Sequence, residues 1–208
     1  MKIVCISDTH QFHRRVEVPD GDVLIHAGDF SNHGQPNAIR DFNSWMAALP
    51  HKHKIVIAGN HDFLFQNHPD QARLILSDVT YLEDSGIEIE GVKFWGSPWS
   101  AEFGDWAFMG NEARLAEQWA KIPNDTQVLI THGPPLDIMD LVQRGERVGS
   151  KSLSSRLTEL KDLKLHVFGH IHESYGIWQH PENGHIFVNA STCDVHYSPI
   201  NPPIVVEL

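Results

Sequence analysis

Short apolar runs that end in Asp, His or Asn recur five times along the chain, and this pattern constrains the fold more than any other feature. Each run has the length of a buried strand. The polar groups that follow the runs occupy residues 7–10, 28–30, 59–62, 131–135 and 169–172. In open α/β sheets, ligands bind beyond the carboxyl ends of the strands. We therefore expect the five polar groups to meet and to form one site.

The remaining segments predict helices and hairpins between these strands. Residues 36–50 place apolar side chains at helical spacing and end at Pro50. Further helices are expected at residues 69–78, 111–122 and 152–161, hairpins at 86–99 and 176–190, and a last strand at 202–208. One large mixed sheet and two packed sheets both fit this order. We predict an α/β fold with two packed mixed β-sheets flanked by helices, in a single domain over residues 1–208.

Composition and charge exclude several classes of partner. The chain has 208 residues, of which 41% are hydrophobic, and its 27 acidic residues outnumber 16 basic ones. A net charge of −11 without a basic cluster does not suit duplex nucleic acid or an anionic membrane. No apolar stretch reaches the ~20 residues that span a bilayer, and the N-terminal apolar run is too short for a signal peptide. Two distant cysteines fit a reduced protein, so we expect a cytoplasmic location. The sequence leaves monomer and dimer open.

The polar groups offer carboxylate, imidazole and amide donors to a metal. The seven candidate ligands are Asp8, His10, Asp29, Asn60, His132, His170 and His172. Mixed nitrogen and oxygen donors suit Mn, Fe, Co or Zn better than Ca or Mg. Seven ligands are too many for one tetrahedral ion, but they suit two ions that share a carboxylate. Paired ions about 3.5–4 Å apart stabilise the attacking and leaving oxygens of phosphoryl transfer.

The motif GHIH, residues 169–172, places two histidines after an apolar run at residues 163–168. In an extended segment, side chains at positions i and i+2 point the same way. We therefore expect His170 and His172 to aim at one point. The alternative is a pair of histidines that make ordinary hydrogen bonds at a strand end. The four matching groups elsewhere in the chain favour the metal interpretation.

The blocks D-x-H, G-D, G-N-H-D, H-G and G-H-x-H, in this order from residue 8 to residue 172, resemble the signature of the calcineurin-like metallophosphoesterase superfamily. The segments DVLIHAGDF, THGPPL, LHVFGHIHESYG and NASTC are similar to the small metallophosphoesterase-domain proteins, which are related to class III cyclic nucleotide phosphodiesterases. The resemblance covers most of the chain. It implies metal-dependent hydrolysis of phosphoesters.

The resemblance also implies a role for each matching residue. The first ion would be held by Asp8, His10, Asp29 and His172. The second would be held by Asp29, Asn60, His132 and His170, with Asp29 bridging the two ions. His61 would protonate the leaving oxygen. Substrate contacts are expected at Asn60, His61, His33 and Arg14, although a solvated loop explains Arg14 equally well.

The expected activity is that of a phosphodiesterase on nucleotides or similar small diesters. A small-molecule phosphomonoesterase is the main alternative. A protein phosphatase fits less well, because GDFSNHG, residues 28–34, lacks the arginine that such phosphatases of the superfamily carry there. A non-catalytic binding scaffold of the same fold is a further alternative. The complete ligand set and His61 argue against it.

Overall fold

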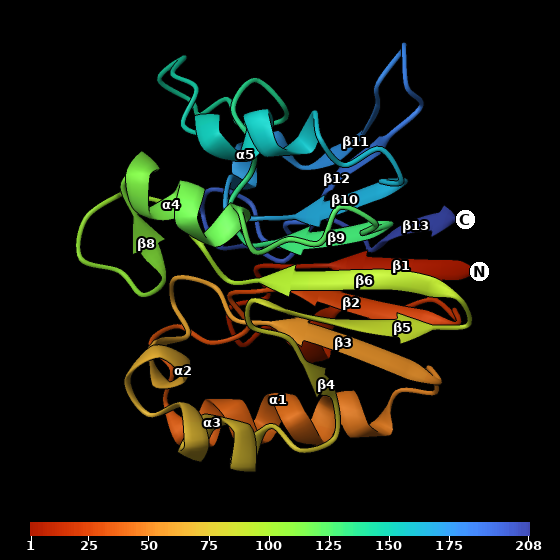
Figure 1. The fold of residues 1–208 in the computed structure, drawn as a ribbon. Helices are drawn as coiled ribbons and strands as arrows, with labels where there is room; N and C mark the ends of the chain where they lie inside the picture. The colour runs from red at the N-terminus through yellow and green to blue at the C-terminus, as the bar shows by residue number, and fades with distance from the viewer.

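Two mixed β-sheets pack face to face between helices, as predicted (Figure 1). The computed structural model describes residues 1–208. The first sheet has the order β13-β1-β2-β3-β4. Its strands are β1 (Lys2–Ile6), β2 (Val23–Ala27), β3 (His53–Ile57), β4 (Thr80–Tyr81) and β13 (Ile204–Glu207). The strands are parallel except for β13, which pairs with β1 in the antiparallel direction.

The second sheet has the order β11-β12-β10-β9-β6-β5. Its strands are β5 (Ser85–Ile89), β6 (Val92–Ser97), β9 (Val128–Thr131), β10 (Leu165–Phe168), β11 (Gly176–Gln179) and β12 (Ile186–Asn189). The four inner strands are parallel, and the two outer strands are antiparallel to their neighbours. A separate pair, β7 (Ser100–Ala101) and β8 (Met109–Gly110), lies in the connection after β6.

The apolar runs of the sequence exist because the strands are buried on both faces. In β1, Ile3 and Cys5 belong to the core between the two sheets. Their neighbours Val4 and Ile6 belong to the core beneath the helices. All four side chains have no exposed surface. Successive side chains of a strand point to opposite faces, so a strand with two covered faces reads as one continuous apolar run.

The helices cover the outer faces of the sheets. Four of the five overlap the predicted segments, whereas the helix at Phe63–Asn67 was not predicted. The helices are α1 (Pro36–Ala48), α2 (Phe63–Asn67), α3 (Pro69–Ile75), α4 (Glu112–Trp119) and α5 (Lys151–Leu157), with short 3₁₀ turns η1 (His13–Arg15) and η2 (His172–Ser174). Asn111 and Ser150 cap α4 and α5 by accepting hydrogen bonds from the backbone amides of Arg114 and Leu153. No helix is long and apolar enough to cross a membrane.

The expectation that GHIH is an extended segment is wrong. Strand β10 ends at Phe168, His170 has a φ angle of 67°, and His172 begins η2. The chain turns because the backbone amide of His170 donates a hydrogen bond of 3.0 Å to the carboxylate of Asp8. Helix α5 is also shorter than the predicted segment 152–161, because its carboxyl end closes at Thr158.

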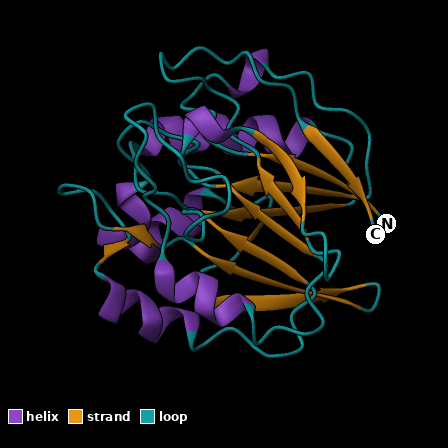
Figure 2. Cartoon of the chain, turned by 90° about the horizontal axis from the view of Figure 1, so that it is seen from above, coloured by secondary structure: helices purple, strands orange, loops and turns teal.

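The two sheets bring the loops at their strand ends together. Figure 2 shows most strand arrows pointing to the same side of the molecule, where the loops gather. The two termini lie on the opposite side in both views (Figures 1 and 2). The carboxyl ends of the parallel strands therefore form a common floor for the candidate site.

The core between the sheets predicts a large cost for truncation there. Ile25→Ala removes a fully buried side chain from this core and should lower the free energy of unfolding by about 2–5 kcal/mol. Urea denaturation measures the change. The control Val205→Ala truncates a side chain that is 38% exposed on β13 and should cost less than about 0.5 kcal/mol. Equal effects of the two substitutions would contradict the assignment of Ile25 to the core.

Candidate metal centre

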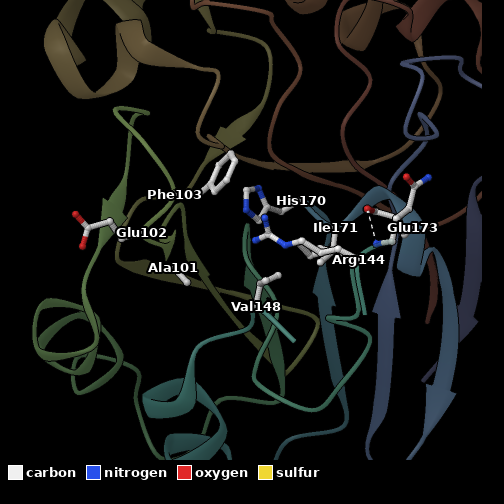
Figure 3. Close-up of a pocket in the computed structure, with 10 residues that line it drawn as sticks. Ala101, Glu102, Phe103, Arg144, Val148, His170, Ile171 and Glu173 are labelled. Carbon is white, nitrogen blue, oxygen red and sulfur yellow. Dashed lines mark hydrogen bonds between the residues drawn. The ribbon is translucent and has the colours of Figure 1, made fainter. Parts of the chain in front are cut away.

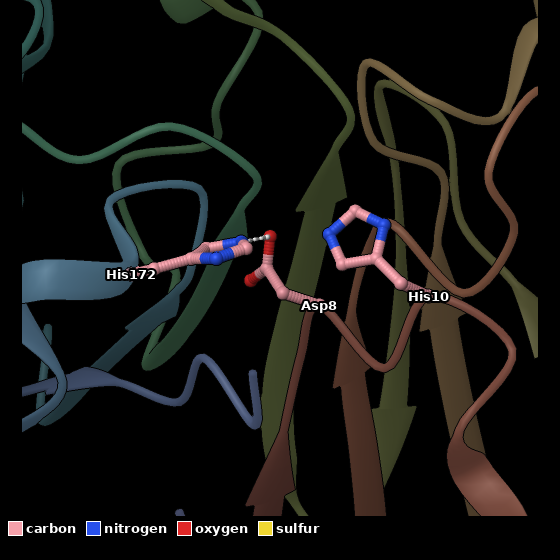
Figure 4. Close-up of side chains that lie close together, drawn as sticks. All are labelled: Asp8, His10 and His172. Atoms are coloured by element: carbon pink, nitrogen blue, oxygen red, sulfur yellow. Dashed lines mark ion pairs between the residues drawn. The ribbon is translucent and has the colours of Figure 1, made fainter. Parts of the chain in front are cut away.

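Residues from both sheets converge where the loops meet. Asp8, Asp29 and Asn60 follow strands of the first sheet, and His132 follows β9 of the second. Nε2 of His132 lies 3.4 Å from Oδ2 of Asp29 and 2.8 Å from Oδ1 of Asn60. Nε2 of His172 lies 3.4 Å from Oδ1 of Asp8 (Figure 4). The expectation that the polar groups after the strands meet is therefore confirmed.

Three overlapping groups of side chains have donor atoms close enough to share a cation. They are Asp8 with His10 and His172, His10 with Asp29 and His61, and Asp8 with Asp29 and His132. Within each group the donor atoms lie within 4.8 Å of one another. Figure 4 shows Asp8 between the rings of His172 and His10. Because the groups share members, they form one continuous donor cluster.

The remaining predicted ligands, and the predicted acid, lie at the border of this cluster. Asn60 reaches it through the contact with His132. The ring of His170 lies 5.0 Å from that of His132, outside the three close groups. His61, predicted to act as an acid, belongs to one close group, with its Nε2 3.9 Å from Oδ2 of Asp29.

Unusual backbone conformations gather at the cluster. Asp8, His10, Asp29 and His170 have φ angles of 49°, 41°, 57° and 67°. Non-glycine residues rarely adopt this left-handed region, and such residues concentrate at functional sites. Hydrogen bonds between the loops hold the conformation, among them that from the amide of His10 to the carbonyl of Asp29, at 3.0 Å.

Two glycines make room for the carboxylates. A Cβ atom added at Gly169 would lie 2.0 Å from Oδ2 of Asp8. A Cβ atom added at Gly59 would lie 2.3 Å from Oδ1 of Asp29. Any other residue would push the carboxylates away, which explains the glycines in the GNHD and GHIH motifs.

Backbone carbonyls orient three of the histidines. The Nδ1–H groups of His132, His172 and His61 donate to the carbonyl oxygens of Ala27, Asp194 and Asn32, at 2.9, 2.9 and 2.8 Å. Each Nε2 atom then faces the cluster. Histidines that bind metals usually donate their other ring N–H in this way.

The buried carboxylates of Asp8 and Asp29 need positive charge nearby to remain ionised. Burial works against the ionised form of Asp8, but the imidazoles of His172, His132 and His10 outweigh it and lower its pKa. Burial also acts to lower the pKa of His132 and His172, yet the carboxylates raise both to about 9. The resulting imidazolium ions supply positive charge where a metal ion would supply it.

The pKa of His10 shifts in the opposite direction to the pKa values of His132 and His172. Burial lowers its pKa to about 4, so the ring is neutral near pH 7. The side chain is buried, and neither ring nitrogen has a hydrogen-bond partner. A buried polar atom without a partner is costly, and a neutral imidazole is the form that binds a metal. The donor cluster therefore fits divalent transition metals.

The sequence motifs missed the structural role of Asp62, the last residue of GNHD. Its buried carboxylate accepts hydrogen bonds from the amides of Asp29 and Gly59, each at 2.9 Å, and from the amide and hydroxyl of Ser31, at 3.0 and 2.6 Å. Burial and the charge of Asp29 raise its pKa to about 7 against the effect of these donors. Asp62 thus ties the loop after β2 to the loop after β3.

Aromatic side chains outside the motifs line the site. The ring of Tyr197 lies 4.7 Å from that of His10 and 5.4 Å from that of His172. The ring of Trp106 lies 4.2 Å from that of His61. Both aromatic residues border a pocket of about 320 Å³ that contains Asp29. Tyr197 follows no polar motif in the sequence. The aromatic-rich segment that contains Trp106, residues 98–110, favours ordinary packing over a wall of the site.

The two remaining residues predicted to contact the substrate, His33 and Arg14, lie in different surroundings. His33 borders the pocket region beside Trp106, and the two rings are nearly parallel at 6.0 Å. Arg14 instead forms an ion pair of 2.7 Å with Asp41 on α1. Its exposed guanidinium does not line the pocket. Arg14 is thus engaged by Asp41 rather than placed at the pocket, and its contact with a phosphate stays a prediction.

Comparison with known proteins agrees with this geometry. Residues 1–174 match the sequence model of the calcineurin-like phosphoesterase family. The chain is 40% identical over its whole length to human metallophosphoesterase domain-containing protein 1, of which it covers 71%. The chain therefore belongs to the calcineurin-like phosphoesterases, a family of hydrolases that act on phosphoesters with a dinuclear divalent metal centre.

Solved structures share the fold. One is described as a novel archaeal phosphodiesterase, with a TM-score of 0.51 and 16% identity, and the match covers 99% of this chain and all of that one. Another is a dimetal phosphatase from Danio rerio, with a TM-score of 0.53 and 12% identity, covering 99% of this chain and 91% of that one. At these identities the likeness concerns the fold alone.

The network around Asp62 predicts a strong effect of its removal. Asp62→Ala leaves four buried donors without an acceptor, and each such loss costs about 1–3 kcal/mol, so the free energy of unfolding should fall by at least about 3 kcal/mol. Urea denaturation tests this. The control Asp125→Ala removes a carboxylate that is 52% exposed and should cost less than about 1 kcal/mol. A change below that of the control would show that Asp62 does not hold the loops together.

Proposed function

We propose that the chain is a dinuclear metal-dependent phosphodiesterase that acts on nucleotides or similar small diesters. The observation that carries this proposal is the arrangement of the pockets. The donor cluster opens into a central pocket of about 320 Å³ that has a further pocket on either side. A phosphodiester has an ester group on each side of phosphorus, whereas a monoester has one.

The flanking pockets lie on different sides of the cluster. One, of about 450 Å³, shares His61, Trp106 and Tyr197 with the central pocket. The other, of about 490 Å³, shares Phe103, His170 and Glu173 with it and contains none of the first three. Each ester group of a diester at the centre would therefore have space of its own. Both pockets have the size of small-molecule sites.

The metal ligands in this proposal are those expected from the sequence. One ion would be held by Asp8, His10, Asp29 and His172, and the other by Asp29, Asn60, His132 and His170. The close approach of Asp29 to both His10 and His132, at 3.9 and 3.4 Å, supports its place between the two ions. Mn, Fe, Co and Zn all suit these donors. When bound, such ions neutralise the charge of the phosphoryl group and activate water.

His61 would act as the general acid. The carbonyl of Asn32 accepts the hydrogen bond from its Nδ1–H, which directs Nε2 into the pocket. Its side chain is 12% exposed, enough for contact with a ligand. A proton on Nε2 would pass to the leaving oxygen. The leaving group would then lie in the flanking pocket that His61 borders, beside Trp106 and His33.

Chelation should abolish activity. The purified protein should hydrolyse p-nitrophenyl diesters in the presence of Mn²⁺ and lose this activity in excess chelator, because the carboxylate and imidazole donors require a divalent cation for the reaction. The same assay with phosphomonoesters, linear diesters and cyclic nucleotides, repeated with each metal, identifies the preferred substrate. Full turnover by protein confirmed to be free of metal would refute the metal mechanism. A higher kcat/KM on monoesters would assign a phosphomonoesterase instead.

Asp29→Ala should remove at least one metal ion. Its carboxylate lies 3.9 Å from Nε2 of His10 and 3.4 Å from Nε2 of His132, one histidine of each proposed ligand set. Elemental analysis of the variant should find one ion per chain or fewer, with activity lost. The control Asp125→Ala changes an exposed carboxylate paired with Lys93 and should leave metal content unchanged. Two ions retained at full occupancy in Asp29→Ala would exclude a bridging role.

His61→Ala should affect substrates selectively. General acid catalysis contributes about 10²–10⁴-fold, and it matters most for a poor leaving group such as a ribose alkoxide. We expect kcat to fall by about 10²-fold or more on a nucleotide diester. On a p-nitrophenyl ester, whose phenolate departs without a proton, the fall should be much smaller. The comparison requires equal metal content in wild type and variant. Equal losses on both substrates would remove His61 from the role of acid.

A further inference from the structure

The pocket beside His170 is built by three segments of the chain, and His170 is the one proposed metal ligand among its lining residues. It has a volume of about 490 Å³ (Figure 3). Its lining residues come from the end of β7 and the segment after it, from the loop after β9 and from the segment after β10. They are Ala101, Glu102, Phe103, Val142, Gln143, Arg144, Val148, His170, Ile171 and Glu173. We call it the His170 groove.

Phe103 offers an exposed aromatic face at this groove. Its side chain is 63% exposed, which is unusual for so large an apolar group. In Figure 3 the ring of Phe103 and the guanidinium of Arg144 extend from different loops toward His170. Aromatic rings stack on planar groups with little dependence on their exact identity. Val142, Val148 and Ile171 add apolar surface.

The loop that carries Arg144 is fixed by its own hydrogen bonds. The buried carboxylate of Asp140 accepts hydrogen bonds from the guanidinium of Arg147 at 2.7 Å and from the amide of Gly149 at 3.1 Å. The amide of Val142 donates to the carbonyl of Glu146 at 3.0 Å. A groove wall formed in advance loses less entropy when a ligand binds.

The charges around the groove favour an uncharged ligand group. Glu102 and Glu173 line it, and the guanidinium of Arg144 is already paired with Glu146 at 2.7 Å. The acidic residues therefore outnumber the single arginine. A second phosphate on the substrate would meet repulsion here, because like charges disfavour each other at short range.

The position of His61 decides which part of a diester can occupy the groove. The acid must contact the leaving oxygen, so the leaving group lies on the side of His61 and Trp106. The His170 groove borders the central pocket through other residues and does not include His61. The ester group that stays on phosphorus would therefore point into this groove.

We propose that the His170 groove binds the retained ester group of the substrate, and that this group is uncharged and aromatic, as a nucleoside is. This inference rests on the proposed phosphodiesterase function. Phe103 is its specificity-determining residue, through stacking on the aromatic group. The hydrolysis product is then a monoester that still carries the aromatic group.

Three p-nitrophenyl diesters test the proposal, because they share a leaving group and differ in the retained group: phenyl, methyl or 4-carboxyphenyl. With Mn²⁺, the wild type should have the highest kcat/KM for the phenyl diester. Phe103→Ala should lower the ratio of kcat/KM for phenyl over methyl about tenfold, the effect of one lost stacking contact. Phe103→Trp keeps an aromatic face and should hold the ratio within about twofold of the wild type.

The matched control is Leu74→Ala, which truncates a side chain that is 81% exposed on α3 and should leave the ratio unchanged. Thermal melts establish that all variants are folded, as expected for exposed positions. Hydrolysis of the diesters with the same ratio in wild type and Phe103→Ala would overturn the groove assignment and leave the phosphodiesterase standing. A preference for 4-carboxyphenyl over phenyl would overturn the uncharged character of the group. A metal-loaded wild type that cleaves none of the diesters would overturn both proposals.

Discussion

The removal of both faces of the inner strands from water is the constraint on which the rest of the structure depends. Strands such as β1 place alternate side chains in the core between the sheets and in the core beneath the helices. Most of the buried polar residues therefore lie at the strand ends, where a loop can supply hydrogen bonds, with His26 and His166 as exceptions within strands. The five Asp, His and Asn motifs occupy these ends, and the packing of the sheets brings them together. The candidate site is thus a consequence of the core.

The architecture could be predicted from the sequence because its strands are buried on both faces. Continuous apolar runs identified the strands, and Pro50 marked the end of α1 within two residues. The conformation of GHIH could not be predicted in this way. The turn at His170 depends on a hydrogen bond to Asp8, which lies 162 residues away, and local patterns carry no information on such a contact. The same limit applies to Arg14, because its partner Asp41 is distant in sequence.

The metal-binding part of the candidate site could be predicted, because the types of its residues alone indicate their chemistry. Aspartate and histidine at a strand end suggest a metal, and the structure brings Asp8, Asp29 and His132 together. Tyr197 and Trp106 carry no such implication, since aromatic residues pack in every core. Their place at the pocket arises from loops whose course depends on tertiary contacts. The role of Asp62 could not be predicted for a different reason. Its carboxylate accepts hydrogen bonds from backbone amides, and the sequence does not show which amides need an acceptor.

The contact between His132 and Asn60 makes the site sensitive to denaturing conditions. The two residues belong to loops of different sheets and lie 2.8 Å apart. A displacement of one sheet against the other by an ångström or two would break this contact while leaving every hydrogen bond within the sheets intact. Active-site geometry tolerates errors of this size poorly. The geometry of the site therefore depends on the relative position of the two sheets. Mild denaturation should abolish activity before any secondary structure is lost.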